Sequence, residues 1–303
     1  MNLYANGDIL NKLLKTIVFN NEITLSVLDT TEMVNDAIRI HNLSPLSAAA
    51  LGRTLTVCTF MSSNLKNQSD KLSVTIKGDG VGGHITVCGN GDLNMRGFID
   101  NPNADLPLRA DGKLNVGGCV GKNGRLTVVR SMGLKEPYTG SSQLVSGEIA
   151  EDITAYFAAS EQTPSVCGLG VLVAQDGTVL TAGGFLIQLL PTADDSIIDM
   201  VEKDIQGIDS VTKMLTDGLT PTEICKKVLS SFDIQELDVM YPEYKCDCSV
   251  QRVQTALISA GREELLDMAN DPVTEVKCQF CNKAYRFTGK DILKLLEDSQ
   301  GEI

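Results

Sequence analysis

The sequence predicts an α+β protein in three parts: an N-terminal mixed domain with antiparallel sheets and packed helices (1–190), a helical linker (191–243) and a small C-terminal domain (244–303). Strand-like patterns in the first part are grouped and joined by turns, which favours antiparallel pairing over a doubly wound sheet. The second part is strongly acidic, and the third holds four cysteines in two close pairs.

Alternating apolar residues predict the strands of the first domain. Ile23, Leu25 and Val27 form the first such pattern. Others follow at Leu72, Val74 and Ile76, at Ile85 and Val87, at Leu114 and Val116, and at Leu126 and Val128. We expect two-residue hairpin turns at Asn123-Gly124 and Asp176-Gly177, because these dipeptides readily adopt the backbone angles that such turns need.

Two helices are expected among these strands. Ser44-Pro45 supplies a cap and a first-turn proline for a long Ala/Leu-rich helix that runs towards Leu65. A second helix is expected around residues 146–159, where Ile149, Ile153 and Phe157 share one face.

The segment 191–243 contains 12 acidic residues against 4 lysines and no arginine, a net charge of −8 within a chain total of −13. Thr220-Pro221-Thr222-Glu223 predicts a capping box at the start of a helix. Short acidic helices are marginal alone, so we expect a metastable linker that folds only when it is docked on a neighbour. Its apolar stripes comprise Ile197, Val201, Ile205, Ile208, Ile224, Val228 and Phe232.

The last part is near the lower size at which a chain folds without added support. We expect helices whose apolar positions are Val253, Leu257, Leu265 and Leu266. Residues Val273 to Phe287 are expected to form a hairpin with Cys278 and Cys281 at its turn. Thr288 and Asp291 are expected to start a final short helix.

Cys246-Asp-Cys248 and Cys278-Gln-Phe-Cys281 are separated by 29 residues. Two such pairs can close around one zinc ion, which accepts four thiolates tetrahedrally. Structural zinc contributes on the order of 10 kcal/mol to small units, so fold and metal should come and go together. Zinc-bound thiolates also react with peroxide, and one S–S bond would remove two ligands. The spacing alone leaves open whether the site is a static support or a redox switch.

Composition argues against several other functions. A net charge of −13 is unlike that of a nucleic-acid-binding protein, and no apolar run approaches the ~20 residues of a membrane span. The start, Met1-Asn-Leu-Tyr, shows no export signal, so we expect a soluble protein of the reducing cytoplasm.

No enzymatic site is expected. His41 and His84 have no paired acid at readable spacing, and the glycine run 78–83 lacks the Gly-Lys-Ser/Thr end of a phosphate-binding loop. Two alternatives use the cysteines differently. A zinc ribbon for nucleic acid would need a basic face, and a thiol–disulfide oxidoreductase using Cys278 and Cys281 would need a thioredoxin-like unit around them.

The other five cysteines are expected to be buried small hydrophobes. They are Cys58, Cys88, Cys119, Cys167 and Cys225.

Beyond these patterns, the chain resembles, over nearly its whole length, the bacterial redox-regulated heat-shock holdase family of about thirty-three kilodaltons. The segments Cys246-Asp-Cys248-Ser249 and Val276-Lys-Cys278-Gln-Phe-Cys281 resemble the zinc signature of that family. Upstream strings resemble its first domain, among them Gly78-Asp-Gly80, Gly133-Leu-Lys-Glu-Pro137-Tyr138 and Leu144-Val-Ser-Gly-Glu-Ile-Ala-Glu-Asp152.

The resemblance implies an ATP-independent chaperone of the oxidative stress response that is inactive while reduced and bound to zinc through Cys246, Cys248, Cys278 and Cys281. It implies that oxidation pairs Cys246 with Cys248 and Cys278 with Cys281 and releases zinc. The linker would then unfold, its apolar stripes would bind unfolding client proteins, and the active form would dimerise. Cys225 lies in the linker and the family pattern assigns it no role that can be read from the sequence, which leaves an off-pathway disulfide at this position open.

Overall fold

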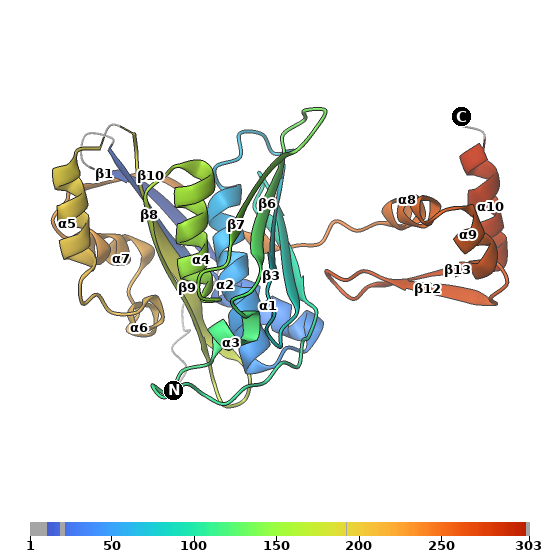
Figure 1. Ribbon diagram of the computed structural model, residues 1–303, viewed down its shortest axis with the longest axis horizontal. Helices are drawn as coiled ribbons and strands as arrows, with labels where there is room; N and C mark the ends of the chain where they lie inside the picture. The colour runs from blue at the N-terminus through green and yellow to red at the C-terminus, as the bar shows by residue number, and fades with distance from the viewer. Residues whose placement is uncertain (1–10, 19–21, 192, 301–303) are drawn as a thin grey trace. The chain divides into compact units, whose positions relative to one another are not determined.

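The computed structural model describes residues 11–18, 22–191 and 193–300, and the chain divides into two compact units, Met1–Lys245 and Cys246–Ile303 (Figure 1). The expectation that the start of the chain carries no export signal concerns residues outside the described ranges. Within the described ranges, no helix is long and apolar enough to cross a membrane.

A five-stranded antiparallel sheet in the order β10-β1-β2-β9-β8 forms one layer of the first unit. Its strands are β1 (Lys12–Val18), β2 (Ile23–Asp29), β8 (Ser165–Val173), β9 (Val179–Leu189) and β10 (Ile234–Met240). The alternation of Ile23, Leu25 and Val27 places these three residues on one buried face of β2, as predicted.

A second sheet, in the order β11-β5-β4-β3-β6-β7, forms the other layer. Its strands are β3 (Lys71–Lys77), β4 (His84–Asn90), β5 (Asn94–Ile99), β6 (Arg125–Ser131), β7 (Tyr138–Gln143) and β11 (Glu243–Tyr244). All pairs are antiparallel except β11 with β5, which is parallel. The glycine run between β3 and β4 is a turn, as expected.

A central helix, α2 (Pro45–Ser62), packs against β4 and β5 of one sheet and β8 and β9 of the other. Ser44 caps it and Pro45 opens it, as predicted, and apolar and small residues are buried on every side of it. The surrounding helical elements are α1 (Thr31–His41), α3 (Val116–Val120), α4 (Ile149–Tyr156) and the π-helical turn η1 (Phe157–Glu161).

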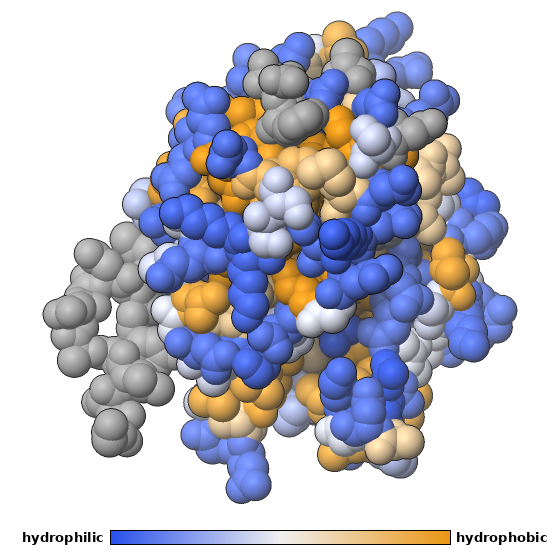
Figure 2. All heavy atoms as spheres, turned by 90° about the vertical axis from the view of Figure 1, so that its left-hand side faces the viewer, coloured by the Kyte–Doolittle hydropathy of each residue, from blue (hydrophilic) through white to orange (hydrophobic). Residues whose placement is uncertain are grey.

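Three helices, α5 (Asp195–Ile205), α6 (Val211–Thr216) and α7 (Pro221–Val228), cover the first sheet on the face that carries Leu14, Leu25 and Phe185. The predicted capping box is present, since Thr220 accepts a hydrogen bond from the N–H of Glu223 and the Glu223 carboxylate accepts one from the N–H of Thr220. Seen from this side, the outer surface is mainly hydrophilic, with smaller hydrophobic areas between (Figure 2). The apolar stripes of these helices therefore point at the sheet.

The second unit contains α8 (Val250–Ala260), α9 (Arg262–Met268), the hairpin of β12 (Val273–Lys277) and β13 (Ala284–Thr288), and α10 (Gly289–Gln300). Its core is small: among the described residues of the unit, seven are buried in it, Leu257, Leu265, Tyr285, Phe287, Ile292, Leu295 and Leu296. The hairpin with Cys278 and Cys281 at its turn is as predicted. Thr288 and Asp291 exchange hydrogen bonds at the start of the last helix, also as predicted.

Two local predictions are wrong. Leu114 and Val116 do not form a strand, because the Asn115 side chain accepts a hydrogen bond from the N–H of Gly118 and caps the short helix α3. Asn123-Gly124 consequently joins a helix to β6 and makes no hairpin. Asp176-Gly177 does join two antiparallel strands, β8 and β9, with Gly177 at a φ of +86°, but the loop is longer than the expected two residues, because the N–H of Ala174 bonds to the carbonyl of Thr178 and closes it.

Candidate metal centre

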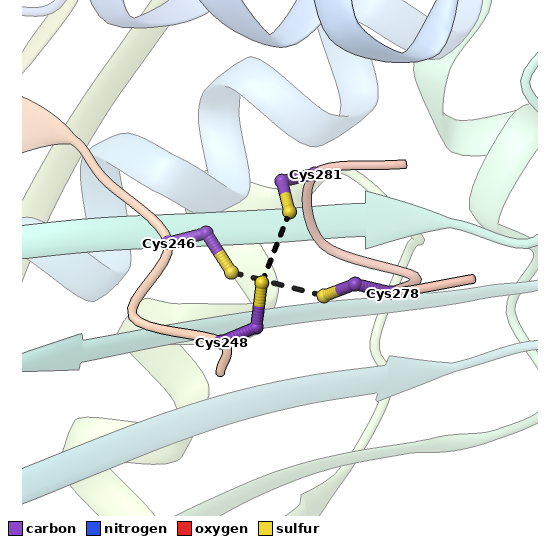
Figure 3. Close-up of side chains that lie close together, drawn as sticks. All are labelled: Cys246, Cys248, Cys278 and Cys281. Atoms are coloured by element: carbon purple, nitrogen blue, oxygen red, sulfur yellow. Dashed lines mark hydrogen bonds between the residues drawn. The ribbon is translucent and has the colours of Figure 1, made fainter. Parts of the chain in front are cut away.

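The four clustered cysteines come from two structural elements of the second unit (Figure 3). Cys246 and Cys248 lie on the extended segment between β11 and α8, and Cys278 and Cys281 lie on the turn between β12 and β13. In that turn the N–H of Cys278 bonds to the carbonyl of Lys283 at 3.0 Å. Residue Asn282 adopts the left-handed conformation, with φ of +58°, which lets the turn close tightly.

The first pair is held by local contacts as well. Asp247, the single residue between Cys246 and Cys248, forms an ion pair with Arg252 of α8. Ser249 caps the same helix by accepting a hydrogen bond from the N–H of Arg252 at 3.3 Å. The segment is therefore fixed to the first turn of α8, and both thiols are presented on one side of it.

The four Sγ atoms lie within 4.8 Å of one another. Cys246 Sγ is 3.7 Å from Cys278 Sγ, and Cys248 Sγ is 3.4 Å from Cys281 Sγ. Four thiolates bound tetrahedrally at about 2.3 Å from zinc would have sulfurs about 3.7 Å apart. The cluster thus has the donor type, number and spacing to hold a metal ion. Each of the two short Sγ–Sγ distances joins a cysteine of the first pair to a cysteine of the second.

The thiols of this cluster differ in acidity. Burial opposes ionisation of Cys248, but hydrogen bonds from Tyr285 and the neighbouring thiols outweigh it and lower the pKa of Cys248 to about 7. The Tyr285 hydroxyl donates to Cys248 Sγ at 3.0 Å. Burial raises the pKa of Cys246 and of Cys281, and neighbouring thiols add to the effect. One thiolate forms readily here, and further ionisation calls for a cation to balance the charge.

The five remaining cysteines lie outside this cluster, in the first unit. Cys58, Cys119 and Cys225 are buried, and Cys88 and Cys167 are partly exposed. Burial raises the pKa of Cys119 to about 11 and the pKa of Cys167 and Cys225 to about 12. The thiols of Cys119, Cys167 and Cys225 are therefore much weaker nucleophiles at neutral pH than that of Cys248.

The structure brings the seven apolar residues predicted in the linker into one cluster on the first sheet. Five are buried and two, Ile205 and Ile208, are partly buried against the same cluster. The buried ones are Ile197, Val201, Ile224, Val228 and Phe232. These apolar side chains therefore pack against the face of the first sheet that β1, β2 and β9 form.

A contact that the sequence did not predict lies just before the cysteines. The Tyr244 hydroxyl donates to the carbonyl of Gly97 at 2.8 Å, accepts from the N–H of Gly97 at 3.3 Å and lies 3.0 Å from Nε2 of His41. The N–H of Lys245 bonds to the carbonyl of Met95 at 2.8 Å. The chain is thus fastened to β5 and α1 immediately before Cys246. No spacing motif signals this contact, because it joins residues far apart in the chain.

Comparison with known proteins gives consistent matches. The family model described as "Hsp33 protein" matches residues 11–288. A protein of Clostridium perfringens named "33 kDa chaperonin" is 45% identical over 295 residues, which cover 97% of this chain and 93% of that protein. A protein of the same name from Clostridium acetobutylicum is 43% identical over 289 residues, 95% of this chain and 97% of that protein.

A solved structure shares the fold as well. The crystal structure of a "33 kDa chaperonin (Heat shock protein 33 homolog)" from Thermotoga maritima superimposes with a TM-score of 0.87 at 32% sequence identity. The match covers 96% of this chain and 99% of that one.

Proposed function

The chain belongs to the Hsp33 family, whose members are chaperones and not enzymes, and from this premise we propose that it is a redox-regulated, ATP-independent holdase of the oxidative stress response. The observation that carries the proposal is the cluster of four thiols that directly follows a segment docked on an apolar sheet face. We also propose the three-part division 1–190, 191–243 and 244–303, with the middle part as the element that moves. A reducing cytoplasm is the compartment that keeps such thiols free.

In the reduced form, Cys246, Cys248, Cys278 and Cys281 would hold one zinc ion. Bound zinc would keep all four sulfurs as thiolates and join the two pairs. The second unit needs that support, because its core contains only seven buried residues within the described part of the unit and Cys248 and Cys278 pack against this core.

Oxidation begins at a thiolate of the cluster. The sulfur attacks one oxygen of a peroxide, the O–O bond breaks, and a sulfenic acid and hydroxide result. A second thiolate then attacks the sulfenic sulfur, expels hydroxide and forms the S–S bond. Cys246 with Cys248, and Cys278 with Cys281, are the proposed pairs. Two such steps leave no thiolate in the cluster to hold zinc.

The linker would detach when the second unit loses its order. It is suited to this, because its helices are short, it carries a net charge of −8, and its burial depends on one sheet face. Tyr244 and β11 lie between the linker and Cys246, so disorder that spreads back from the cluster meets this contact first. The released stripes (Ile197, Val201, Ile205, Ile208, Ile224, Val228 and Phe232) and the uncovered face would bind unfolding clients, and the active form would be a homodimer.

One experiment tests the proposal. Zinc-loaded protein is treated with peroxide at raised temperature, while zinc release and the aggregation of a thermally unfolding test protein are followed together. We expect both zinc release and suppressed aggregation. The Cys225→Ser variant should bind and release zinc like the unaltered protein, because Cys225 lies outside the cluster. Oxidised protein that releases zinc and leaves aggregation unchanged would refute the proposed function.

A further inference from the structure

The pairing of β1 with β10 has a consequence for how clients bind. β10 is the outermost strand of its sheet and lies within the segment 191–243, which we propose detaches on activation (Figure 1). It pairs antiparallel with β1 from Leu13 opposite Met240 to Val18 opposite Ile234. When β10 leaves, β1 becomes an edge strand with unpaired N–H and C=O groups, which is a template for another extended chain.

β10 is held on β1 mainly through its backbone. Its central side chains from Gln235 to Val239 are all exposed, including the apolar Leu237 at 55% and Val239 at 36%. Only the ends of β10 contact a hydrophobic core. Ile234 packs against the cluster under α5–α7, and Met240 packs against the core around α2. A position that needs so little from the side chains of its occupant suits extended segments of many sequences.

The edge of β1 is continuous with the apolar face that α5–α7 cover. Leu14 and Val18 belong to the cluster under those helices, together with Ile23 and Leu25 of β2. A strand added to β1 would place alternate side chains over the same face. Backbone pairing and apolar burial would then act on one bound segment.

Lys15 gives this edge a charge preference. Its ammonium donates to Asn64 Oδ1 at 2.7 Å and to the carbonyl of Ser63 at 3.2 Å, and its strand register places it opposite Asp238. A partly buried lysine disfavours pairing with a strand that brings no acid, and opposite charges across a strand pair are favourable.

We propose that, after release of the linker, the edge of β1 binds an extended apolar segment of an unfolded client by antiparallel strand addition in the place of β10, with preference for an acidic residue opposite Lys15. This inference rests on the proposed redox release. Pairing with β1 of a second copy is disfavoured, because it would bring the lysines of two identical strands together.

The test follows amide hydrogen exchange of residues 13–18 in the full chain, with a synthetic ten-residue peptide of alternating valine and threonine and a central glutamate as the probe. We expect the amides of β1 that point towards β10, about every second one, to lose protection on peroxide activation and to regain it when the peptide binds, while the amides that bond to β2 stay protected. Protection of the amides towards β10 that stays high after activation overturns the inference, because β10 or a second copy then still occupies the edge. Peptide or client binding that leaves the amides towards β10 unprotected also overturns it, while suppressed aggregation in the same sample leaves the proposed function standing.

Charge exchange sharpens the test. The oxidised protein should bind the glutamate peptide about threefold more tightly than the same peptide with a central lysine, as expected of one cross-strand charge pair. Lys15→Met should abolish this preference. Lys12→Met is the matched control. Lys12 lies opposite Asp29 in the strand register with β2 and has no residue of β10 opposite it. If the preference for the glutamate peptide survives Lys15→Met, or is lost equally in Lys12→Met, the peptide's acidic residue does not lie opposite Lys15.

Discussion

The hydroxyl of Tyr244 lies 3.0 Å from Nε2 of His41, although 203 residues separate the two in the chain. The same hydroxyl is bonded to the backbone of Gly97, and Cys246 follows two residues later. The cysteine cluster thus starts directly after this contact, and under the proposed function disorder of the second unit would reach Tyr244 before it reaches the segment 191–243.

Tyr244→Phe should therefore make the linker easier to release. The change removes hydrogen bonds worth about 1 kcal/mol each and leaves partly buried groups of Gly97 unpaired. We expect faster proteolysis within residues 191–243 in the reduced, zinc-loaded protein and activation by peroxide at a lower temperature. Tyr241→Phe is the control, because Tyr241 is 53% exposed. Equal proteolysis rates in the two variants would show that Tyr244 does not restrain the linker.

Cys248 should be the first thiol to react in a short iodoacetamide pulse near neutral pH, given to the reduced protein directly after metal removal, while the second unit is still folded. Its pKa of about 7 lies below the usual value of 9.0, so its thiolate is populated at a pH where Cys225, with a pKa of about 12, is protonated. Ionisation of Cys248 favours the folded unit at high pH, and this stabilisation is lost as the pH falls through about 7. Peptide mass spectrometry across pH 6–9 gives the order of labelling. Prior labelling of Cys246 would contradict it.

Tyr285→Phe should weaken metal binding by about tenfold or more, because groups that hydrogen-bond to a ligand orient it and tune its basicity. The Tyr285 hydroxyl donates to Cys248 Sγ at 3.0 Å, while the ring stays in the small core and is kept by phenylalanine. Competition with a chromophoric zinc chelator measures the affinity. Phe287→Tyr serves as a control for altered packing, since Phe287 lies in the same core. An unchanged affinity in Tyr285→Phe would show that the hydroxyl does not act on the site.

Ile224→Ala tests the apolar stripe of α7. Ile224 is fully buried against the sheet, so the truncation should destabilise the docked linker by about 2–5 kcal/mol. We expect release at a lower temperature together with weaker holding of clients per active molecule, because the same side chain is a proposed client contact. Lys226→Ala, on the exposed side of the same helix, should change neither property. If the linker is released at a lower temperature but clients are held as well as by the unaltered protein, Ile224 is not a client-binding residue, and the proposed redox switch still stands.

Local sequence signals predicted the parts of this fold that depend on neighbours in the chain. The alternation at Ile23, Leu25 and Val27, the capping box at Thr220 and the hairpin around Cys278 are of this kind. The two-residue pattern at Leu114 and Val116 was too short to separate a strand from a helix, and the side chain of Asn115 decided the outcome.

The parts that escaped prediction depend on distant partners. β10 was not predicted because its apolar residues are divided between the two sets of alternate positions, Ile234 and Met240 in one and Leu237 and Val239 in the other, so that neither set is consistently apolar. Its pairing with β1, more than 200 residues earlier, makes it a strand. The contact of Tyr244 with His41 is equally invisible in the sequence. The four cysteines were identifiable because their spacing is itself the signal, whereas their acidity depends on Tyr285 and on the packing around them.

Removal of the metal without an oxidant separates the two roles of the cluster. With a chelator under reducing conditions, we expect α8, α9 and α10 to lose amide protection, because seven buried residues replace little of the roughly 10 kcal/mol that structural zinc contributes to small units. The strands β2 and β9 should stay protected, since they belong to the much larger core of the first unit. Zinc added back should restore protection in the unaltered protein and in Cys225→Ser, but not in Cys248→Ser. If α10 stays protected while the metal is absent, the second unit folds on its own core, and zinc loss by itself cannot be what starts release of the linker.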